Sequence, residues 1–278
     1  MTFAFVESTA KHVEARQNNV KPVNIKSTDV APVYKDPNSF SAPTKLLSAS
    51  CESCALYNLC LPISVNKNVF GKLDTIIQRR KPVKQGSHLF RHGDAFHALY
   101  VVRTGCLKTY TISPDGQNQI TGFYTPGEVL GLDGLNSSYH TNYAKTLENT
   151  SICKIPFTEL EKLSREIPSL QRHLFSLMAR EIEVDQKLIM LINNRSADQR
   201  IAAFLLNISD RFKTRRLSGS SFRLPMSRGD IANYLGLAVE TVSRVFSKLQ
   251  TRKILTAENK EVTILDLVAL GNLSNNMQ

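Results

Sequence analysis

Three of the chain's five cysteines lie within ten residues of one another, at Cys51, Cys54 and Cys60. Thiols at this spacing can converge on one metal centre once the loop between them curls. The two other cysteines, Cys106 and Cys153, lie far downstream. A fourth thiol ligand would therefore come from another part of the fold, and the site would hold the N-terminal loop against that part. Loss of the site would release the loop, which is an arrangement typical of a sensor.

The composition of the chain favours metal ligation over disulfide bonding for these cysteines. No apolar run approaches the ~20 residues that a membrane span needs, and the N-terminus lacks the apolar core of a secretory signal. We therefore expect a cytoplasmic protein with no membrane partner. In a reducing cytosol, clustered thiols are metal ligands more often than disulfide partners.

Residues 1–167 divide by composition and residue pattern into three segments. Residues 1–48 carry Pro, Ser, Asn and Lys without periodicity, which predicts a disordered or extended tail. Residues 49–80 hold the cysteine-rich segment and a short amphipathic helix predicted over 66–80. From 81 to 167, glycines separate short runs rich in β-branched and aromatic residues. Many short strands at this spacing predict an antiparallel sandwich or jelly roll, which would be the sensor domain.

Residues 168–194 are predicted to form one long helix, because Pro168 suits a first helical turn and two apolar stripes follow at helical spacing. The stripes comprise Leu170, Leu174, Leu177, Val184, Leu188 and Leu191, and Phe175, Met178, Ile182, Ile189 and Ile192. One stripe would pack against its own domain, whereas a second suggests another copy of the same helix. At 1.5 Å per residue, roughly 25 residues span about 38 Å, which is enough to pair two chains.

Asp185 interrupts the second stripe, and we expect it at a dimer interface together with Ile182 and Ile189. Two carboxylates that face each other near a two-fold axis weaken pairing through desolvation and like-charge repulsion. A dimer made marginal in this way can be switched by a small change elsewhere. The alternative is an edge position at which Asp185 simply reaches water.

The C-terminal segment, residues 195–278, contains a predicted helix-turn-helix. Ser227–Asp230 has the pattern of a capping box at the start of a short helix, which stops at Gly236. A second helix is predicted from Val239 to about Gln250, and two short helices joined by a glycine-containing turn form this motif. A hairpin after the second helix makes the motif winged. Thirteen Lys and Arg face five Asp and Glu from Arg195 to Lys260, an excess of +8 that favours contact with phosphates.

The second helix would place its N-terminal residues in the major groove of double-stranded DNA. Its outward side chains include Glu240, Ser243 and Arg244, with Lys248 further along. Arg244 suits a bidentate contact to guanine, and Glu240 can accept from the amino group of cytosine. Lys248 is expected to meet phosphate, which adds affinity without sequence information.

The order of β sandwich, long helix and winged helix-turn-helix, an α+β fold, resembles that of the CRP/FNR family of bacterial transcription regulators. The resemblance covers about Cys51 to Leu270. Val239–Arg244 is similar to the Glu-x-x-Ser-Arg recognition helix of the FNR branch, and Ile120–Phe123 and Cys153–Phe157 are also FNR-like. The sandwich would then be a cyclic-nucleotide-binding-like jelly roll.

The resemblance implies an oxygen-sensing regulator of anaerobic metabolism rather than an enzyme. It implies a [4Fe–4S] cluster on Cys51, Cys54, Cys60 and Cys153. It also implies a homodimer, a palindrome of TTGAT-like half-sites, and a contact between RNA polymerase and the turn Ser113–Gly116. With the cluster intact the N-terminal loop would be held and the dimer favoured, and oxygen would reverse both.

Alternatives remain for the metal and for the fourth ligand. Four thiolates can also hold zinc, so the spacing leaves open a DNA-binding regulator with a structural zinc site and no oxygen response. Cys106 follows Gly105 in a predicted hairpin and suits a small buried apolar position, whereas Cys153 lies shortly before the long helix. Leu59, beside Cys60, is either a shield for the site or an ordinary packing residue. No nucleophile–base group or phosphate loop indicates an enzyme.

The resemblance also extends to proteins that bind cyclic nucleotides, but the phosphate site of that branch is missing. A nucleotide pocket needs a cation for the phosphate, which related proteins supply as Arg-Ser or Arg-Thr after a Gly-Glu turn. Gly127–Glu128 is present, yet no arginine occurs from Thr104 to Ile152, and His140 stands near where it would be. We therefore expect no cyclic nucleotide.

Overall fold

The computed structural model describes residues 50–56, 59–60, 70–79 and 81–275. The chain divides into two units, residues 1–47 and 48–278, and all described residues belong to the second. The tail predicted over residues 1–48 therefore lies outside the described residues.

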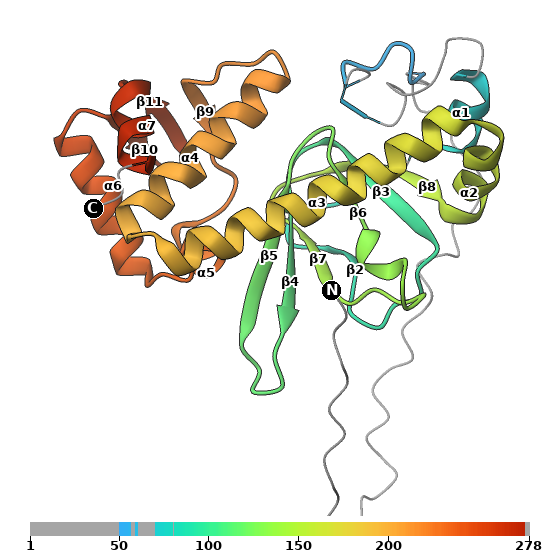
Figure 1. Ribbon diagram of the computed structural model, residues 1–278, viewed down its shortest axis with the longest axis horizontal. Helices are drawn as coiled ribbons and strands as arrows, with labels where there is room; N and C mark the ends of the chain where they lie inside the picture. Colours follow the sequence, from blue (N-terminus) through green and yellow to red (C-terminus); the bar gives the residue numbers. More distant parts are fainter. Residues whose placement is uncertain (1–49, 57–58, 61–69, 80, 276–278) are drawn as a thin grey trace, which may run out of the picture. The chain divides into compact units, whose positions relative to one another are not determined.

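Short strands form two four-stranded antiparallel sheets, with strand orders β1-β8-β3-β6 and β2-β7-β4-β5 (Figure 1). The strands are β1 (Gln78–Arg79), β2 (His88–Phe90), β3 (Ala98–Thr104), β4 (Leu107–Ile112), β5 (Asn118–Tyr124), β6 (Val129–Leu130), β7 (Tyr143–Thr146) and β8 (Ser151–Pro156). Leu107 and Thr109 in β4 are buried while Lys108 and Tyr110 are half-buried, which is the alternation of a strand with one face on a core. The predicted jelly roll is confirmed.

The turn between β3 and β4 requires the glycine that the sequence places there. Gly105 has φ of +85°, and a Cβ added to it would lie 2.6 Å from the carbonyl oxygen of Asn149. A side chain would be strained and would also collide with backbone.

The helix predicted over 66–80 is only partly correct within the described residues. Helix α1 (Phe70–Ile76) ends early, and Gln78 and Arg79 form β1 instead. This strand pairs with β8 and places Arg79 opposite Cys153. Two residues are too few to show a strand periodicity, so the pairing with β8 was not visible in the sequence.

Two helices follow the sheets. Helix α2 (Phe157–Glu166) ends at Ile167, which has an extended backbone, and α3 (Pro168–Asn194) begins at the proline. Proline disfavours helical backbone angles for the residue before it and suits the first position of a helix. The break between α2 and α3 at Ile167 therefore has a local cause. The long helix is present as predicted.

The C-terminal part is a winged helix-turn-helix. Its elements are α4 (Ala197–Thr214), β9 (Ser221–Arg223), α5 (Arg228–Leu235), α6 (Val239–Thr251), β10 (Leu255–Glu258), β11 (Glu261–Ile264) and α7 (Leu267–Asn275). The sheet has the order β10-β11-β9, and α4, α5 and α6 share one core with it. Helix α7, which packs on α4, was not predicted.

Helix α5 docks on the free edge of β5. The Asn233 side chain donates to the carbonyl oxygen of Asn118 (2.7 Å) and accepts from the amide of Ile120 (2.6 Å). Lys108 forms an ion pair of 2.5 Å with Asp230 beside it. The sheet β2-β7-β4-β5 and the helix-turn-helix are thus joined by polar contacts as well as by a shared core. Among the described helices, none is long and apolar enough to cross a bilayer.

Candidate DNA interface and cysteine site

Both ends of α5 are fixed by local chemistry. The Ser227 hydroxyl accepts from the Asp230 amide at 3.0 Å, and the Asp230 carboxylate accepts from the Ser227 amide at 2.9 Å, which is the reciprocal geometry of a capping box. Gly236 ends the helix in a left-handed conformation with φ of +62°. These two signals set the turn that leads into α6.

Helix α6 has one buried and one exposed face. Val242, Val245, Phe246 and Leu249 are buried in the core of the domain. The four residues predicted to contact DNA are all exposed: Glu240, Ser243, Arg244 and Lys248. The structure therefore places them together on one helix with free access to a groove-sized partner.

Three of these side chains make contacts that the sequence did not suggest. The Arg244 guanidinium donates to the Thr241 hydroxyl at 3.2 Å, and the Ser243 hydroxyl donates to the Val239 carbonyl at 3.0 Å. Lys248 forms an ion pair with Asp198 in α4. Because Asp198 lies fifty residues earlier, no local pattern could have indicated it.

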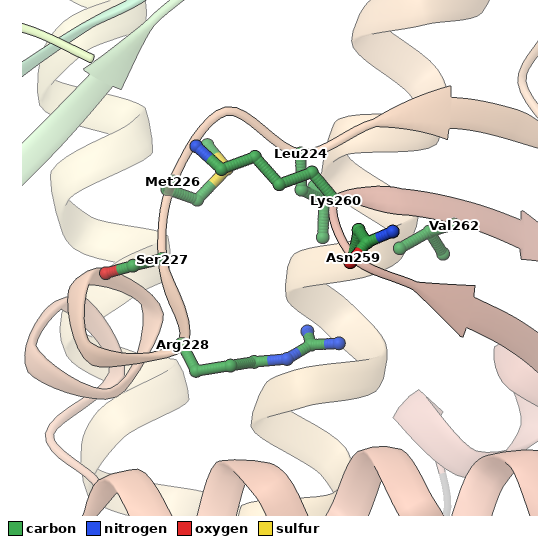
Figure 2. A pocket seen from close by; sticks show the side chains of 7 residues that line it. All are labelled: Leu224, Met226, Ser227, Arg228, Asn259, Lys260 and Val262. Carbon is green, nitrogen blue, oxygen red and sulfur yellow. The ribbon is translucent and has the colours of Figure 1, made fainter.

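A small pocket lies between the start of α5 and the wing. Its volume is about 140 Å³, and Figure 2 shows Arg228 extending toward the β10–β11 turn, where Asn259 and Lys260 lie. The guanidinium of Arg228 lies 3.1 Å from the ring centroid of Phe246, and burial lowers its pKa to about 10. The ammonium of Lys260 donates to the Pro225 carbonyl at 2.7 Å. Drug-sized ligands occupy roughly 300 Å³ or more, so the pocket is too small for them.

Three of the four predicted metal ligands lie in or against one apolar core. Cys51 is buried in it, and the half-buried Cys60 and Cys153 pack against it. Cys54 is also half-buried. Among the described residues, no three of the His, Cys, Asp and Glu side chains lie close enough to hold a metal ion. Four cysteine thiolates are chemically suited to hold an iron–sulfur cluster or another thiolate-ligated metal centre. The shared core places the loop that carries Cys51 and Cys60 near the strand of Cys153.

Cys106 lies apart from this core. Its side chain is 1% exposed, its thiol donates to the Leu107 carbonyl at 3.6 Å, and burial raises its pKa well above the ordinary value. These are the properties expected of a small buried apolar side chain.

Cys51 is held by two residues outside the cysteine segment. Its amide donates to the Asp74 carboxylate at 2.9 Å, and the Arg79 guanidinium donates to its sulfur at 3.3 Å. Arg79 and Asp74 also form an ion pair. Burial raises the pKa of Cys51 to about 12, and the Asp74 carboxylate adds to this shift. Nothing in the spacing of the sequence singled out Asp74 or Arg79.

The core that holds Cys51 also contains the beginning of α3. Leu170 is buried in it, and Leu174 and Leu177 pack against it. Residue Leu59 of the cysteine segment lies against the β5–β6 turn, because a Cβ added to Gly127 would be 3.1 Å from its Cβ. The cysteine segment therefore touches the same parts of the fold that support the long helix.

The two stripes of α3 differ in exposure. In the first stripe, Leu170, Leu174 and Leu177 pack in or against the core that holds Cys51, and Leu191 packs against the core of the helix-turn-helix. In the second, Phe175, Ile182 and Ile189 are 58%, 59% and 59% exposed at spacings of seven residues. Asp185 is exposed on the same side, and partial burial raises its pKa. Glu181, which interrupts the first stripe, accepts a hydrogen bond of 2.5 Å from the Tyr124 hydroxyl. An apolar row at every seventh residue is the pattern of paired helices.

His140 is buried inside the sensor domain. Its ring stacks on Phe90 with centroids 3.7 Å apart, and its Nδ1 lies 3.2 Å from the Asp133 carboxylate. The side chain at this position therefore packs into the core.

The fold and the helix-turn-helix define a DNA-binding transcription regulator, and comparisons with known proteins agree. Residues 199–273 match the Crp-like helix-turn-helix domain, and residues 80–166 match the cyclic nucleotide-binding domain. The chain is 48% identical over 237 residues to the transcriptional activator protein Anr of Pseudomonas protegens, covering 84% of this chain and 97% of that protein. It is 42% identical over 224 residues to the fumarate and nitrate reduction regulatory protein of Escherichia coli, covering 81% and 90%.

A solved structure agrees with this assignment. FixK2 from Bradyrhizobium japonicum superposes with a TM-score of 0.66 at 29% identity, over 73% of this chain and all of that one. The chain belongs to the CRP/FNR family, and its similarity to the FNR-type regulators covers most of its length. It is a transcription regulator that binds DNA through its helix-turn-helix, and not an enzyme.

Proposed function

We propose that this regulator senses oxygen through a [4Fe–4S] cluster held by Cys51, Cys54, Cys60 and Cys153. The observation that carries the proposal is the common core of Cys51, Cys60 and Cys153 with the start of α3. The relatives that are 42–49% identical include an anaerobic regulatory protein and fumarate and nitrate reduction regulatory proteins, which supports oxygen as the signal. We also propose the domain limits predicted above and a cytoplasmic location.

When bound, the cluster supplies a redox-active centre that oxygen can attack. Cys51, Cys60 and Cys153 share a core with residues of α1, β8 and the start of α3, and the bound cysteines would hold their loop there. Leu59, packed on Gly127, limits access to this region from the side of the β5–β6 turn. Release of the cysteines removes these restraints from the first turns of α3.

The dimer would form through the exposed stripe of α3, with Ile182, Asp185 and Ile189 at the interface. Pairing brings two copies of α6 to half-sites one helical turn apart, which matches a palindrome of TTGAT-like half-sites. Glu240, Ser243 and Arg244 would read bases and Lys248 would meet phosphate once it leaves Asp198. The exposed turn Ser113–Gly116 would contact RNA polymerase.

The experiment that tests the cofactor is purification without oxygen, followed by absorbance and metal analysis before and after air. We expect iron and sulfide in the protein and a broad visible band that bleaches in air. A colourless protein with one zinc and an unchanged spectrum would show the structural-zinc alternative to be correct.

A further inference from the structure

The contacts of Cys51 join three segments that lie apart in the sequence. Asp74 belongs to α1 and Arg79 to β1, and they reach Cys51 across 23 and 28 residues. Both side chains are largely shielded from solvent, at 30% and 23% exposure. A charged hydrogen bond in such a place contributes more than the same bond at the surface.

Arg79 also fixes where Cys51 lies relative to Cys153. In the β1–β8 pairing, Arg79 is directly opposite Cys153. One guanidinium nitrogen therefore contacts Cys51 and Asp74 from a strand position that faces another predicted ligand. Through β1, the Cys51 loop is thus joined to β8, the strand of Cys153, which lies about a hundred residues later in the sequence.

We propose that Asp74 and Arg79 are positioning residues that hold Cys51 beside the Cys153 strand and so preform part of the cluster site. The inference rests on the ligand set proposed above. Closing a long loop costs entropy, and contacts that close it beforehand reduce the cost of gathering the ligands. Loss of either contact should therefore loosen Cys51 and speed the loss of the cluster.

The first arm of the test measures hydrogen exchange of the Cys51 amide in the cluster-free full-length chain. Asp74→Ala removes the acceptor of this amide, so exchange should rise at least about fivefold, which corresponds to one lost hydrogen bond. Asp74→Asn keeps an acceptor oxygen and should give a smaller rise. Arg79→Gln should also raise exchange, because Asp74 is no longer held.

The matched control is Lys72→Gln. Lys72 lies in α1 two residues before Asp74, and the side chains of its ion pair with Glu166 are 63% and 60% exposed. The change removes a charge from the same helix without touching Cys51, so exchange should stay as in the wild type. Circular dichroism checks that each variant folds, and Asp74→Asn serves if Asp74→Ala does not.

The second arm measures iron transfer from the loaded chain to a chelator in the absence of oxygen. Asp74→Ala and Arg79→Gln should lose iron at least about fivefold faster than the wild type and Lys72→Gln. Unchanged amide exchange would overturn the positioning role, and faster exchange with wild-type iron loss would overturn its link to the cluster. A wild-type chain that takes up no iron would instead refute the proposed cofactor, and the exchange arm would still decide whether the two residues hold Cys51.

Discussion

At the scale of single residues, we propose that Asp185 sets how strongly two copies of α3 can pair. Ile182 and Ile189 on either side of it are each 59% exposed, so this apolar stripe can be buried against a second chain. Partial burial already raises the pKa of Asp185 in the single chain, which shows that its charged form is disfavoured on this face. A second chain would desolvate the carboxylate further and place its own beside it.

Replacing Asp185 with alanine should give a dimer that persists in air. Removal of the repulsion should tighten pairing at least about tenfold, or about 1.4 kcal/mol. Sedimentation of the aerobic protein measures this, with Gln186→Ala, an exposed change on the same helix, as the control. An aerobic monomer in Asp185→Ala would show that repulsion does not limit pairing.

Gly127 packs against the side chain of Leu59. Its φ is +95°, and an added Cβ would lie 3.1 Å from the Leu59 Cβ. Gly127→Ala should displace Leu59 and shorten the lifetime of the visible band in air, severalfold if Leu59 shields the site. Gly116→Ala is the control, because its φ is also positive (+82°) but nothing lies within 4 Å of the added atom. Equal lifetimes in the two variants would assign Leu59 to ordinary packing.

At the scale of elements, the half-buried carboxyl group of Glu181 links α3 to β5 through its hydrogen bond with Tyr124. Burial raises the pKa of Glu181 above its ordinary value, Asp185 adds to the shift, and the hydrogen bond from Tyr124 opposes it. The folded chain thus binds this proton more tightly than the unfolded chain. The stability that this proton contributes is full below the unfolded pKa and is lost as the pH rises through the folded pKa.

Glu181→Gln should therefore gain stability relative to the wild type as the pH rises from about 4, the ordinary range of a Glu carboxyl. The amide can still accept from Tyr124, so the hydrogen bond is kept. Urea unfolding at several pH values measures the difference. Glu183→Gln is the control: Lys187 lowers the pKa of this exposed carboxyl, so its contribution is lost as the pH falls. A pH-independent difference for Glu181→Gln would contradict the account.

In the proposed DNA interface, Arg244 of α6 contributes sequence specificity and Lys248 contributes general affinity. Arg244→Ala should cost about 1–3 kcal/mol at a palindromic site and should relax the preference at one base pair. Lys248→Ala should weaken binding to all sequences and lower its salt dependence. Titration of matched and single-mismatch duplexes at two salt concentrations measures both. Equal losses on matched and mismatched DNA for Arg244→Ala would remove it from base contact.

At the scale of the whole described molecule, the sequence predicted what local chemistry decides. The capping box of Ser227 and Asp230, the stop at Gly236 and the break before Pro168 depend on neighbouring residues, and all are present. The contacts that join distant segments were not predicted. Lys108 and Asp230 pair across 122 residues, and Cys51 and Asp74 across 23, with no periodic pattern linking them.

The same distinction applies to the cysteines. Their spacing indicated a site, and the structure brings Cys51, Cys60 and Cys153 to one core. Spacing carries no information on which strand faces the loop, because that depends on the β1–β8 pairing. The approach of Arg79 could therefore be found only from the fold.

In the proposed function, the state of the cysteine site controls pairing of α3 and hence DNA binding. The most direct test is sedimentation of one sample with palindromic DNA, first without oxygen and then after air, with absorbance recorded in the same cell. We predict two 31.1 kDa chains per duplex without oxygen, and free single chains once the visible band has bleached. A bleached protein that stays dimeric on DNA would contradict the claim.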